Sequence, residues 1–285
     1  MDFHDKIKEG KTLFSFEVFP PKKTCGIETV FDTLSELQSL RPDFMSVTYN
    51  AGGSGNSDLT KNIALKVMQG GSAAVAHLTC INNSREEIAA ILTDFKAVGI
   101  ENILALRGDI NPDIPPKHDF KYASDLAKFI KEFGGFHVMG ACYPECHLEA
   151  KNEIEDILNL KKKVESGVDH LISQLFFDNT KFYDFRQKVA IAGINVPIEA
   201  GIMPVVNKNQ IEKMVSMCGA SLPAKFAKVM QRFENNPEAL RDAGIAYAVD
   251  QIVDLISNGV DGIHLYTMNN PYVAKTISAA IKNLL

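Results

Sequence analysis

Short runs of apolar and β-branched residues recur along the chain, and segments with helical periodicity separate them. Runs of this length and composition are typical of strands buried in a parallel sheet. The pattern predicts eight strands: Leu13–Val18, Phe44–Tyr49, Ala73–Thr79, Asn102–Leu106, Phe136–Tyr143, His170–Phe176, Val196–Ile202 and Gly262–Tyr266.

The segments between these runs have the period of helices that bury one face. Ser84 followed by Glu87 has the pattern of a capping box, and Asn152 with Glu155 repeats this start signal. Two apolar faces at helical spacing are formed by Val30, Phe31, Leu34, Leu37 and Leu40, and by Ile88, Ile91, Leu92, Phe95 and Val98.

Strands that alternate with helices predict a parallel sheet, and eight strands is the number that closes a (β/α)8 barrel. An open, doubly wound sheet is the alternative. Residues 203–261, between the seventh and eighth strands, are long enough for at least two helices, one before and one after Pro237. We interpret them as helices inserted into the barrel, and we predict a single α/β domain of TIM-barrel type over residues 1–285.

The composition is that of a globular protein, with 46% hydrophobic and 23% charged residues among 285. The net charge is −5 and no long run of like charge occurs, which argues against a nucleic-acid-binding surface. The five cysteines show no paired spacing. No apolar stretch is long enough to span a membrane, and the N-terminus lacks the apolar core of a signal peptide. We therefore expect a cytoplasmic protein without a membrane partner.

Polar and titratable side chains follow almost every predicted strand. In a (β/α)8 barrel these strand ends meet at one face, where catalytic residues collect. Glu17 is the sharpest candidate, because it lies between Phe16 and Val18 and is followed by Phe19 and two prolines. Apolar surroundings disfavour a charged carboxylate, which suits a general acid that works at neutral pH. The alternative is a structural glutamate on an exposed strand edge.

Three other features allow more than one interpretation. His77, His147 and Glu145 have ligand chemistry, but metal-dependent barrels carry more carboxylates at their strand ends, and we predict no metal. No Gly-x-Gly-x-x-Gly follows a strand, which argues against a Rossmann site, and the glycine-rich residues 52–55 lack the lysine of a P-loop. Finally, four residues share a helical spacing typical of a solvated face or of a strip that contacts ribose and phosphate: Asp156, Asn159, Lys162 and Lys163.

Taken together, the strand ends resemble the methylenetetrahydrofolate reductase family in its bacterial form, which consists of the catalytic domain alone. The resemblance covers nearly the whole chain and implies that the C-terminal regulatory domain of eukaryotic members is absent. The motifs that carry it are Glu17 in Phe-Glu-Val-Phe-Pro-Pro, Thr48-Tyr49, His77-Leu78-Thr79-Cys80, Leu106-Arg107-Gly108-Asp109, Tyr143-Pro144-Glu145 with His147, and Gln174 before Phe176-Phe177-Asp178.

The resemblance implies a (β/α)8 barrel that binds FAD without a Rossmann motif and forms homo-oligomers. Such an enzyme reduces 5,10-methylenetetrahydrofolate to 5-methyltetrahydrofolate with NADH or NADPH in a ping-pong scheme, and so supplies methyl groups for methionine synthesis. Glu17 matches the general acid that protonates the folate N5. Asp109 matches a carboxylate near the flavin and the pterin, which favours a cationic iminium.

Further residues take their roles from the same resemblance. Thr48 matches a nicotinamide-side position, Gln174 one that contacts folate and nicotinamide in turn, and Gln210 a folate-side position. The positions that match FAD contacts are Tyr49, Ala51, His77, Arg107, Gly108, Asp109, Ala123, Tyr143, His147, Ala150, Asp156, Asn159, Lys162 and Lys163.

The chain departs from the family pattern at two positions. Met214 replaces a phenylalanine, which removes ring stacking, and Asn270 replaces an arginine, which removes a charge contact to a folate carboxylate. Two hypotheses from other classes remain: a pterin-binding methyltransferase barrel without a tightly bound flavin, and a non-catalytic barrel that serves as a binding module.

Overall fold

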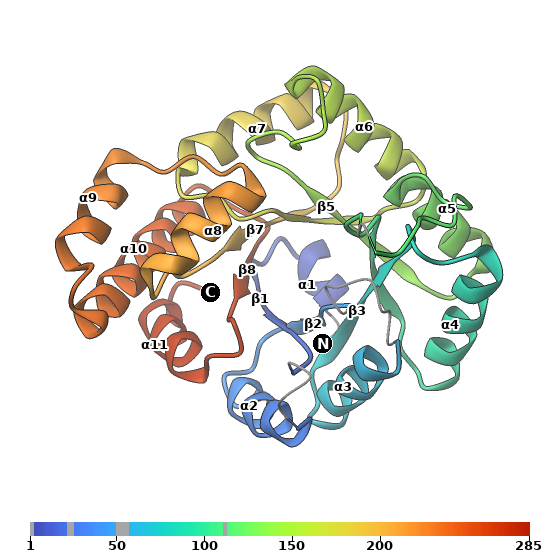
Figure 1. Ribbon diagram of the computed structural model, residues 1–285, viewed down its shortest axis with the longest axis horizontal. Helices are drawn as coiled ribbons and strands as arrows, with labels where there is room; N and C mark the ends of the chain where they lie inside the picture. Colours follow the sequence, from blue (N-terminus) through green and yellow to red (C-terminus); the bar gives the residue numbers. More distant parts are fainter. Residues whose placement is uncertain (1–2, 22–25, 50–56, 111–112) are drawn as a thin grey trace.

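The computed structural model describes residues 3–21, 26–49, 57–110 and 113–285. Eight parallel strands form a closed barrel in chain order, with helices around it, which confirms the predicted (β/α)8 fold (Figure 1). Strand β1 pairs with β8, so the alternative of an open sheet is wrong. The strands are β1 Leu13–Val18, β2 Phe44–Val47, β3 Ala73–Thr79, β4 Asn102–Leu106, β5 His137–Cys142, β6 His170–Ser173, β7 Ile198–Ile202 and β8 Gly262–Tyr266.

Four of the predicted strands are longer than the observed ones. The predictions for β2, β5 and β6 ran past the C-terminal ends, into residues such as Tyr49, Tyr143 and Phe176. These residues are apolar or aromatic because they pack above the barrel, where the chain has already left the strand pairing. The prediction for β7 began too early, since Pro197 has no amide hydrogen to give to the sheet.

The helices follow the predicted alternation. The capping box of Ser84 and Glu87 is present, and the Asn152 side chain accepts from the Glu155 amide, so both predicted start signals are confirmed. The helices are α1 Phe3–Lys8, α2 Glu28–Gln38, α3 Ser57–Gln69, α4 Arg85–Ala97, α5 Ala123–Phe133, α6 Glu153–Glu165, α7 Asn179–Ile191, α8 Lys208–Cys218, α9 Ala224–Phe233, α10 Pro237–Ser257 and α11 Pro271–Ile281.

Three helices, α8, α9 and α10, lie between β7 and β8, as the long interval predicted. Helix α10 begins at Pro237 and packs beside α9 and α11. Helix α8 lies in front of the barrel in Figure 1, on the side of the strand C-termini, whereas α1 lies behind it. The inserted segment thus brings one helix to the end of the barrel where the polar strand ends gather.

The barrel interior holds an apolar cluster and a set of buried polar residues. The cluster takes one residue from each of β1 to β6: Leu13, Phe44, Val75, Leu104, Met139 and Ile172. Phe3 of α1 belongs to the same cluster. Buried polar residues accompany it: Ser15 on β1, Ser46 on β2, His170 on β6, Glu199 on β7 and His264 on β8.

No helix in the part of the chain that the structure describes has both the length and the apolar character to cross a membrane.

Candidate active site

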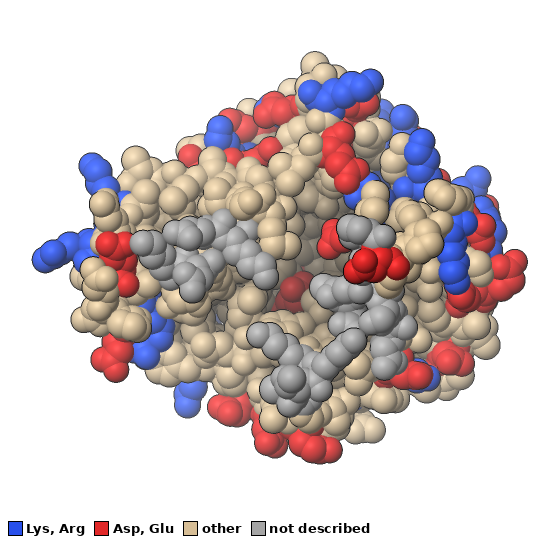
Figure 2. Space-filling model, viewed as in Figure 1, with Lys and Arg blue, Asp and Glu red and all other residues tan. Residues whose placement is uncertain are grey.

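The C-terminal ends of the strands surround a hollow at the centre of one face of the molecule. Figure 2 shows this face, with acidic side-chain atoms inside the hollow and most lysines and arginines toward the periphery. A site that protonates or stabilises a bound molecule is expected at this end of a (β/α)8 barrel.

Glu17 lies at this end of β1, with 21% of its side chain exposed. The loop after β8 fixes its backbone, because the Thr267 hydroxyl donates to the Glu17 carbonyl at 2.7 Å. The Asn269 side chain holds Phe19 through two hydrogen bonds, accepting from its amide at 3.1 Å and donating to its carbonyl at 2.8 Å. The position of the carboxyl therefore depends on contacts between the first and last strands.

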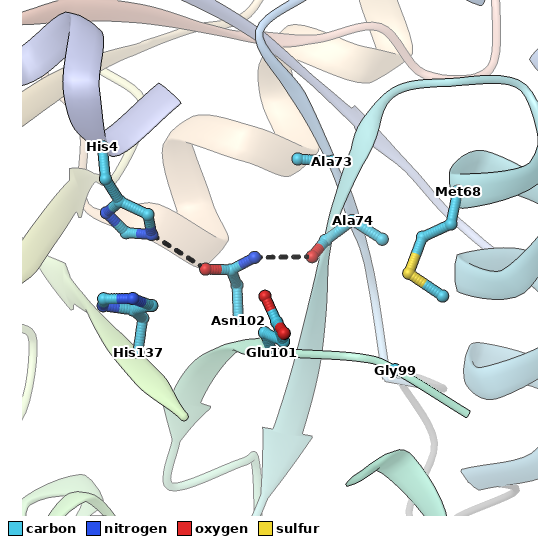
Figure 3. Close-up of a pocket in the computed structure, with 8 residues that line it drawn as sticks. All are labelled: His4, Met68, Ala73, Ala74, Gly99, Glu101, Asn102 and His137. Carbon is cyan, nitrogen blue, oxygen red and sulfur yellow. Dashed lines mark hydrogen bonds between the residues drawn. The ribbon is translucent and has the colours of Figure 1, made fainter. Parts of the chain in front are cut away.

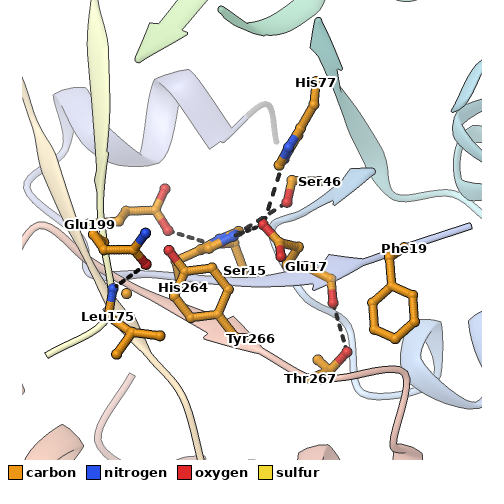
Figure 4. Close-up of polar contacts among 12 residues, drawn as sticks. Ser15, Glu17, Phe19, Ser46, His77, Leu175, Glu199, His264, Tyr266 and Thr267 are labelled. Carbon is orange, nitrogen blue, oxygen red and sulfur yellow. Dashed lines mark hydrogen bonds and ion pairs between the residues drawn. The ribbon is translucent and has the colours of Figure 1, made fainter. Parts of the chain in front are cut away.

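Two buried histidines face the Glu17 carboxylate (Figure 4). Its Oε2 lies 3.7 Å from His77 Nε2 and 3.9 Å from His264 Nε2. Burial lowers the pKa of His77 to about 4, so this imidazole is neutral at pH 7 and gives no ion pair to Glu17. The His77 Nε2 atom is also buried without a hydrogen-bond partner among the described residues.

A chain of polar contacts continues from His264 into the barrel (Figure 4). Ser15 Oγ lies 2.7 Å from His264 Nδ1 and donates to Glu199 Oε2 at 2.5 Å. The other Glu199 oxygen lies 2.8 Å from His170 Nε2. Sequence reasoning missed this network, although its signal was present: Ser15, Glu199 and His264 are polar residues inside strands that are otherwise apolar.

The ends of β6, β7 and β8 form a second wall of the hollow. The Tyr266 hydroxyl donates to the Ser173 carbonyl at 2.8 Å, and burial raises the pKa of this phenol well above its usual value. Gly201 makes room for the ring, because a methyl group there would come within 2.8 Å of Tyr266 and 2.2 Å of the Ser173 carbonyl oxygen. Gln174 follows β6, and its Oε1 accepts from the Leu175 amide at 2.8 Å.

The end of β4 provides a cation, a glycine and a carboxylate in succession. Arg107 forms a two-pronged ion pair with Glu149, with the longer contact at 2.7 Å. Gly108 has φ +87°, and a Cβ there would come within 3.0 Å of Thr79. Asp109 is exposed at the edge of the hollow.

The loop after β5 joins this rim to α6. The rings of Tyr143 and His147 meet edge to face, with centroids 4.5 Å apart. Asp156 Oδ2 accepts from the His147 amide at 3.0 Å. Burial raises the pKa of Tyr143 to about 12, and it also raises the pKa of Asp156.

The predicted strip on α6 is divided between two environments. Asp156 and Lys163 face the barrel, and the Lys163 ammonium donates to the Ala141 carbonyl at 2.6 Å. Burial lowers the pKa of Lys163. Asn159 and Lys162 are exposed. The one-face geometry thus holds for Asp156 and Lys163, whereas Lys162 points toward solvent because it lies about a third of a turn away.

The remaining predicted residues are distributed around the same rim. Thr48 donates its amide to the Val18 carbonyl, and Tyr49 beside it is buried. Ala123 is the first residue of α5, and Ala150 donates its amide to the His147 carbonyl. Ala51 lies outside the described residues.

Helix α8 carries Gln210 and Met214. Gln210 is buried, and its Oε1 accepts from the Val206 amide at 3.2 Å. Met214 and Tyr266 both pack against the apolar cluster that includes Leu175 and Met203. Asn270, where the family pattern has arginine, caps α11 by accepting from the Val273 amide at 3.3 Å.

A cavity of about 140 Å³ lies at the opposite end of the barrel (Figure 3). Its lining includes Ala73, Asn102 and His137, the first residues of β3, β4 and β5. His4 of α1 lies 2.9 Å from the Asn102 side-chain oxygen and stacks on His137. This cavity is separate from the strand C-termini and contains none of the predicted site residues.

Among the residues that the structure describes, no three His, Cys, Asp or Glu side chains are grouped as a metal site would require.

Comparison with known proteins gives a family match over nearly the whole chain. The model of the family described as methylenetetrahydrofolate reductase matches residues 2–282. The 5,10-methylenetetrahydrofolate reductase of Pectobacterium carotovorum subsp. carotovorum is 38% identical over 270 residues, which cover 94% of this chain and 90% of that protein. The protein of the same name from Escherichia coli (strain K12) is 37% identical with the same coverage.

Two more distant similarities extend this comparison. Methylenetetrahydrofolate reductase (NADH) 1 of Arabidopsis thaliana is 35% identical over 305 residues, which cover 98% of this chain but 50% of that protein. A solved structure of an uncharacterized protein from Clostridium thermocellum, described as binding two copies of 5-methyl-5,6,7,8-tetrahydrofolic acid, has a TM-score of 0.75 over 99% of both chains. At 14% identity this second likeness concerns the fold alone.

Proposed function

The chain belongs to the methylenetetrahydrofolate reductase family, and from this premise we propose that it reduces 5,10-methylenetetrahydrofolate to 5-methyltetrahydrofolate with electrons that NADH or NADPH delivers through bound FAD. The proposed scheme is ping-pong: the nicotinamide and the folate occupy the same hollow in turn. We further propose that one catalytic domain spans residues 1–285.

The observation that carries this proposal is the environment of Glu17. Its backbone is fixed at the mouth of the barrel by Thr267, and its side chain is partly exposed. The neighbouring His77 is neutral at pH 7, because burial lowers its pKa to about 4. Glu17 therefore forms no ion pair with His77, and its partly exposed carboxyl can contact a molecule bound in the hollow, as a general acid must.

The residues around the hollow fit a flavin nucleotide. The unpartnered, buried Nε2 of His77 is available for a hydrogen bond, and Gly108, with φ +87°, lets the backbone come close to a flat ring. Arg107 and Lys162 supply positive charge for a diphosphate. We propose that FAD is held by Tyr49, Ala51, His77, Arg107, Gly108, Asp109, Ala123, Tyr143, His147, Ala150, Asp156, Asn159, Lys162 and Lys163.

When bound at these residues, FAD would supply hydride transfer between the nicotinamide and the folate methylene carbon. In the proposed mechanism, Glu17 donates its proton to the folate N10, and the bond between N10 and the methylene carbon breaks, so that the methylene stays on N5 as a cationic iminium. The protonated atom is N10 rather than the expected N5, because the product carries its methyl group on N5. Asp109 stabilises that cation electrostatically. Thr48, Gln174 and Gln210 orient the two substrates in turn.

Replacement of Glu17 by glutamine tests the proposal. Reduction of FAD by NAD(P)H involves no protonation of the folate, so this half-reaction should remain within a few-fold of the wild-type rate. Folate reduction should fall about 10²–10⁴-fold, as expected for the loss of a general acid. Anaerobic stopped-flow absorbance at the flavin band measures both half-reactions separately.

Asp32→Asn, at an exposed position on α2, provides a matched control that should leave both rates unchanged. An equal fall of both half-reactions in Glu17→Gln would contradict the role of Glu17 as an acid. A wild-type protein that binds no FAD would contradict the proposed activity itself.

A further inference from the structure

Two segments from distant parts of the chain meet beside the hollow. One is the loop between β5 and α6, residues 143–152, and the other is the turn between α8 and α9, residues 219–223. Both carboxylate oxygens of Glu145 accept from the Ser221 amide, at 3.1 and 3.0 Å. Glu145 has no role in the proposed chemistry, so this contact calls for a separate explanation.

A packing contact accompanies this hydrogen bond. Gly219 ends α8 in the left-handed region, with φ +68°. A methyl group at Gly219 would come within 2.6 Å of the Leu148 Cδ2 atom. The glycine thus lets Leu148 of the β5–α6 loop approach the end of α8 closely. Two independent contacts, one polar and one apolar, therefore join the same two segments.

The β5–α6 loop belongs to the proposed FAD site. Tyr143 and His147 meet edge to face within it, and the His147 amide is bound by Asp156. Glu149 of the same loop pairs with Arg107 of the β4 rim. A ligand that contacts these residues would restrict the loop that carries Glu145.

Helix α8 and the end of β8 share one apolar cluster. Met214 and Cys218 of α8 pack against this cluster, and so does Tyr266. Tyr266 is the register partner of Glu17 between β8 and β1. The end of α8 also lies within electrostatic range of the β4 rim. Burial raises the pKa of the Cys218 thiol at this end, and the Asp109 carboxylate of the rim adds to that effect.

We propose that Glu145 is a positioning residue that links the β5–α6 loop to α8, so that FAD bound on the loop also orders the helix that faces the folate. The inference rests on the proposed function for the identity of the two ligands, whereas the contact itself is independent of it.

Hydrogen–deuterium exchange of the full chain, with and without FAD, tests the coupling. In the FAD-free protein, Glu145→Ala should speed exchange of amides in residues 214–221 about five-fold, the effect of losing one net hydrogen bond. FAD should slow exchange in both segments of the wild-type protein, but in Glu145→Ala only in residues 143–152. Glu145→Gln, which keeps one acceptor oxygen, should be intermediate.

Glu153→Ala is the matched control, since Glu153 is an exposed glutamate at the start of α6 that pairs with Lys188 of α7. Its exchange pattern should equal that of the wild type. In the holoenzyme, Glu145→Ala should raise the KM for the folate several-fold and leave the rate of flavin reduction at saturating NAD(P)H within two-fold.

Unchanged exchange of residues 214–221 in Glu145→Ala, or FAD protection that still reaches α8 in that variant, would overturn the proposal. If FAD fails to protect residues 143–152 in the wild type, the proposed function fails instead, and the FAD-free comparison still decides whether Glu145 positions α8.

Discussion

At the scale of single residues, Glu17 is held by contacts from both ends of the chain. Its backbone is held from β8, and among the described residues the basic groups closest to its carboxylate are two imidazoles. Buried His77 is held in its neutral form by desolvation, with a pKa lowered to about 4. The partly exposed carboxyl therefore lies between these buried rings and the hollow, where a proposed acid can reach a bound molecule.

The lowered pKa of His77 predicts an acid-sensitive contribution to stability. The pKa of His77 falls from 6.5 in the unfolded chain to about 4 in the folded one, so below pH 6.5 the unfolded state binds a proton that the folded state does not. The contribution of His77 to the free energy of unfolding should therefore be complete above pH 6.5. It should decline by about 2–3 kcal/mol between pH 7 and pH 4.5.

Urea unfolding of the FAD-free protein at the two pH values measures this decline. Asparagine does not titrate. The free energy of unfolding of His77→Asn should therefore fall by about 2–3 kcal/mol less than that of the wild type over the same pH range. Identical pH dependence of the two proteins would show that His77 is not the group responsible.

At the scale of elements, close approaches between backbone segments decide where glycine is required. Gly201 on β7 leaves space for the Tyr266 ring, and Gly262 on β8 leaves space for the Glu199 side chain. Gly244 lies inside α10, where helix propensity would favour alanine by about 1 kcal/mol. There, an added Cβ would stand 1.7 Å from the Val205 carbonyl oxygen.

Gly244→Ala should therefore destabilise the protein by about 1–3 kcal/mol or more, the cost of forcing an extra group into a packed interface. Because the obstacle is backbone, a change of rotamer cannot relieve it. Thermal and urea unfolding show whether the substitution stabilises or destabilises the protein. Ala246→Gly, on the exposed face of α10, is the reference variant, and helix propensity alone should make it less stable by about 1 kcal/mol. A more stable Gly244→Ala variant would contradict the packing of α10 on the β7 loop.

At the scale of the whole molecule, barrel closure brings residues from both halves of the chain into one polar network. Ser15 of β1, Glu199 of β7 and His264 of β8 contact one another only because β1 pairs with β8. The network lies beside the apolar cluster of the interior, since Phe44 of that cluster stacks on His264. It also lies directly below Glu17, so the stability of the barrel and the position of the proposed acid share the same contacts.

Glu199→Ala should lower the free energy of unfolding by about 3–5 kcal/mol, because it leaves Ser15 and His170 buried without their partner. Glu132→Ala, at an exposed position on α5, should change it by less than about 1 kcal/mol. Urea unfolding of both variants at pH 7 gives the comparison. Similar, small effects would mean that the interior tolerates the loss of the network.

Much of the molecule was predictable from local patterns. Strand positions followed from apolar runs, because a strand buried on both faces must be apolar along its length. The helix starts at Ser84 and Asn152 followed from their side-chain chemistry, since a cap acts within three residues. Glu17 stood out for the same reason: its immediate neighbours are apolar.

The sequence by itself determined the order of strands and helices, the inserted helices and the residues at the strand ends. The tertiary structure decided what surrounds each of those residues. Closure of the barrel brought His77 and His264 to Glu17, split the α6 strip between barrel and solvent, and joined Glu145 to Ser221. The physical reason is that hydrophobic period and capping act over a few residues, whereas burial, charge neighbours and cross-barrel hydrogen bonds depend on pairs up to some 250 residues apart.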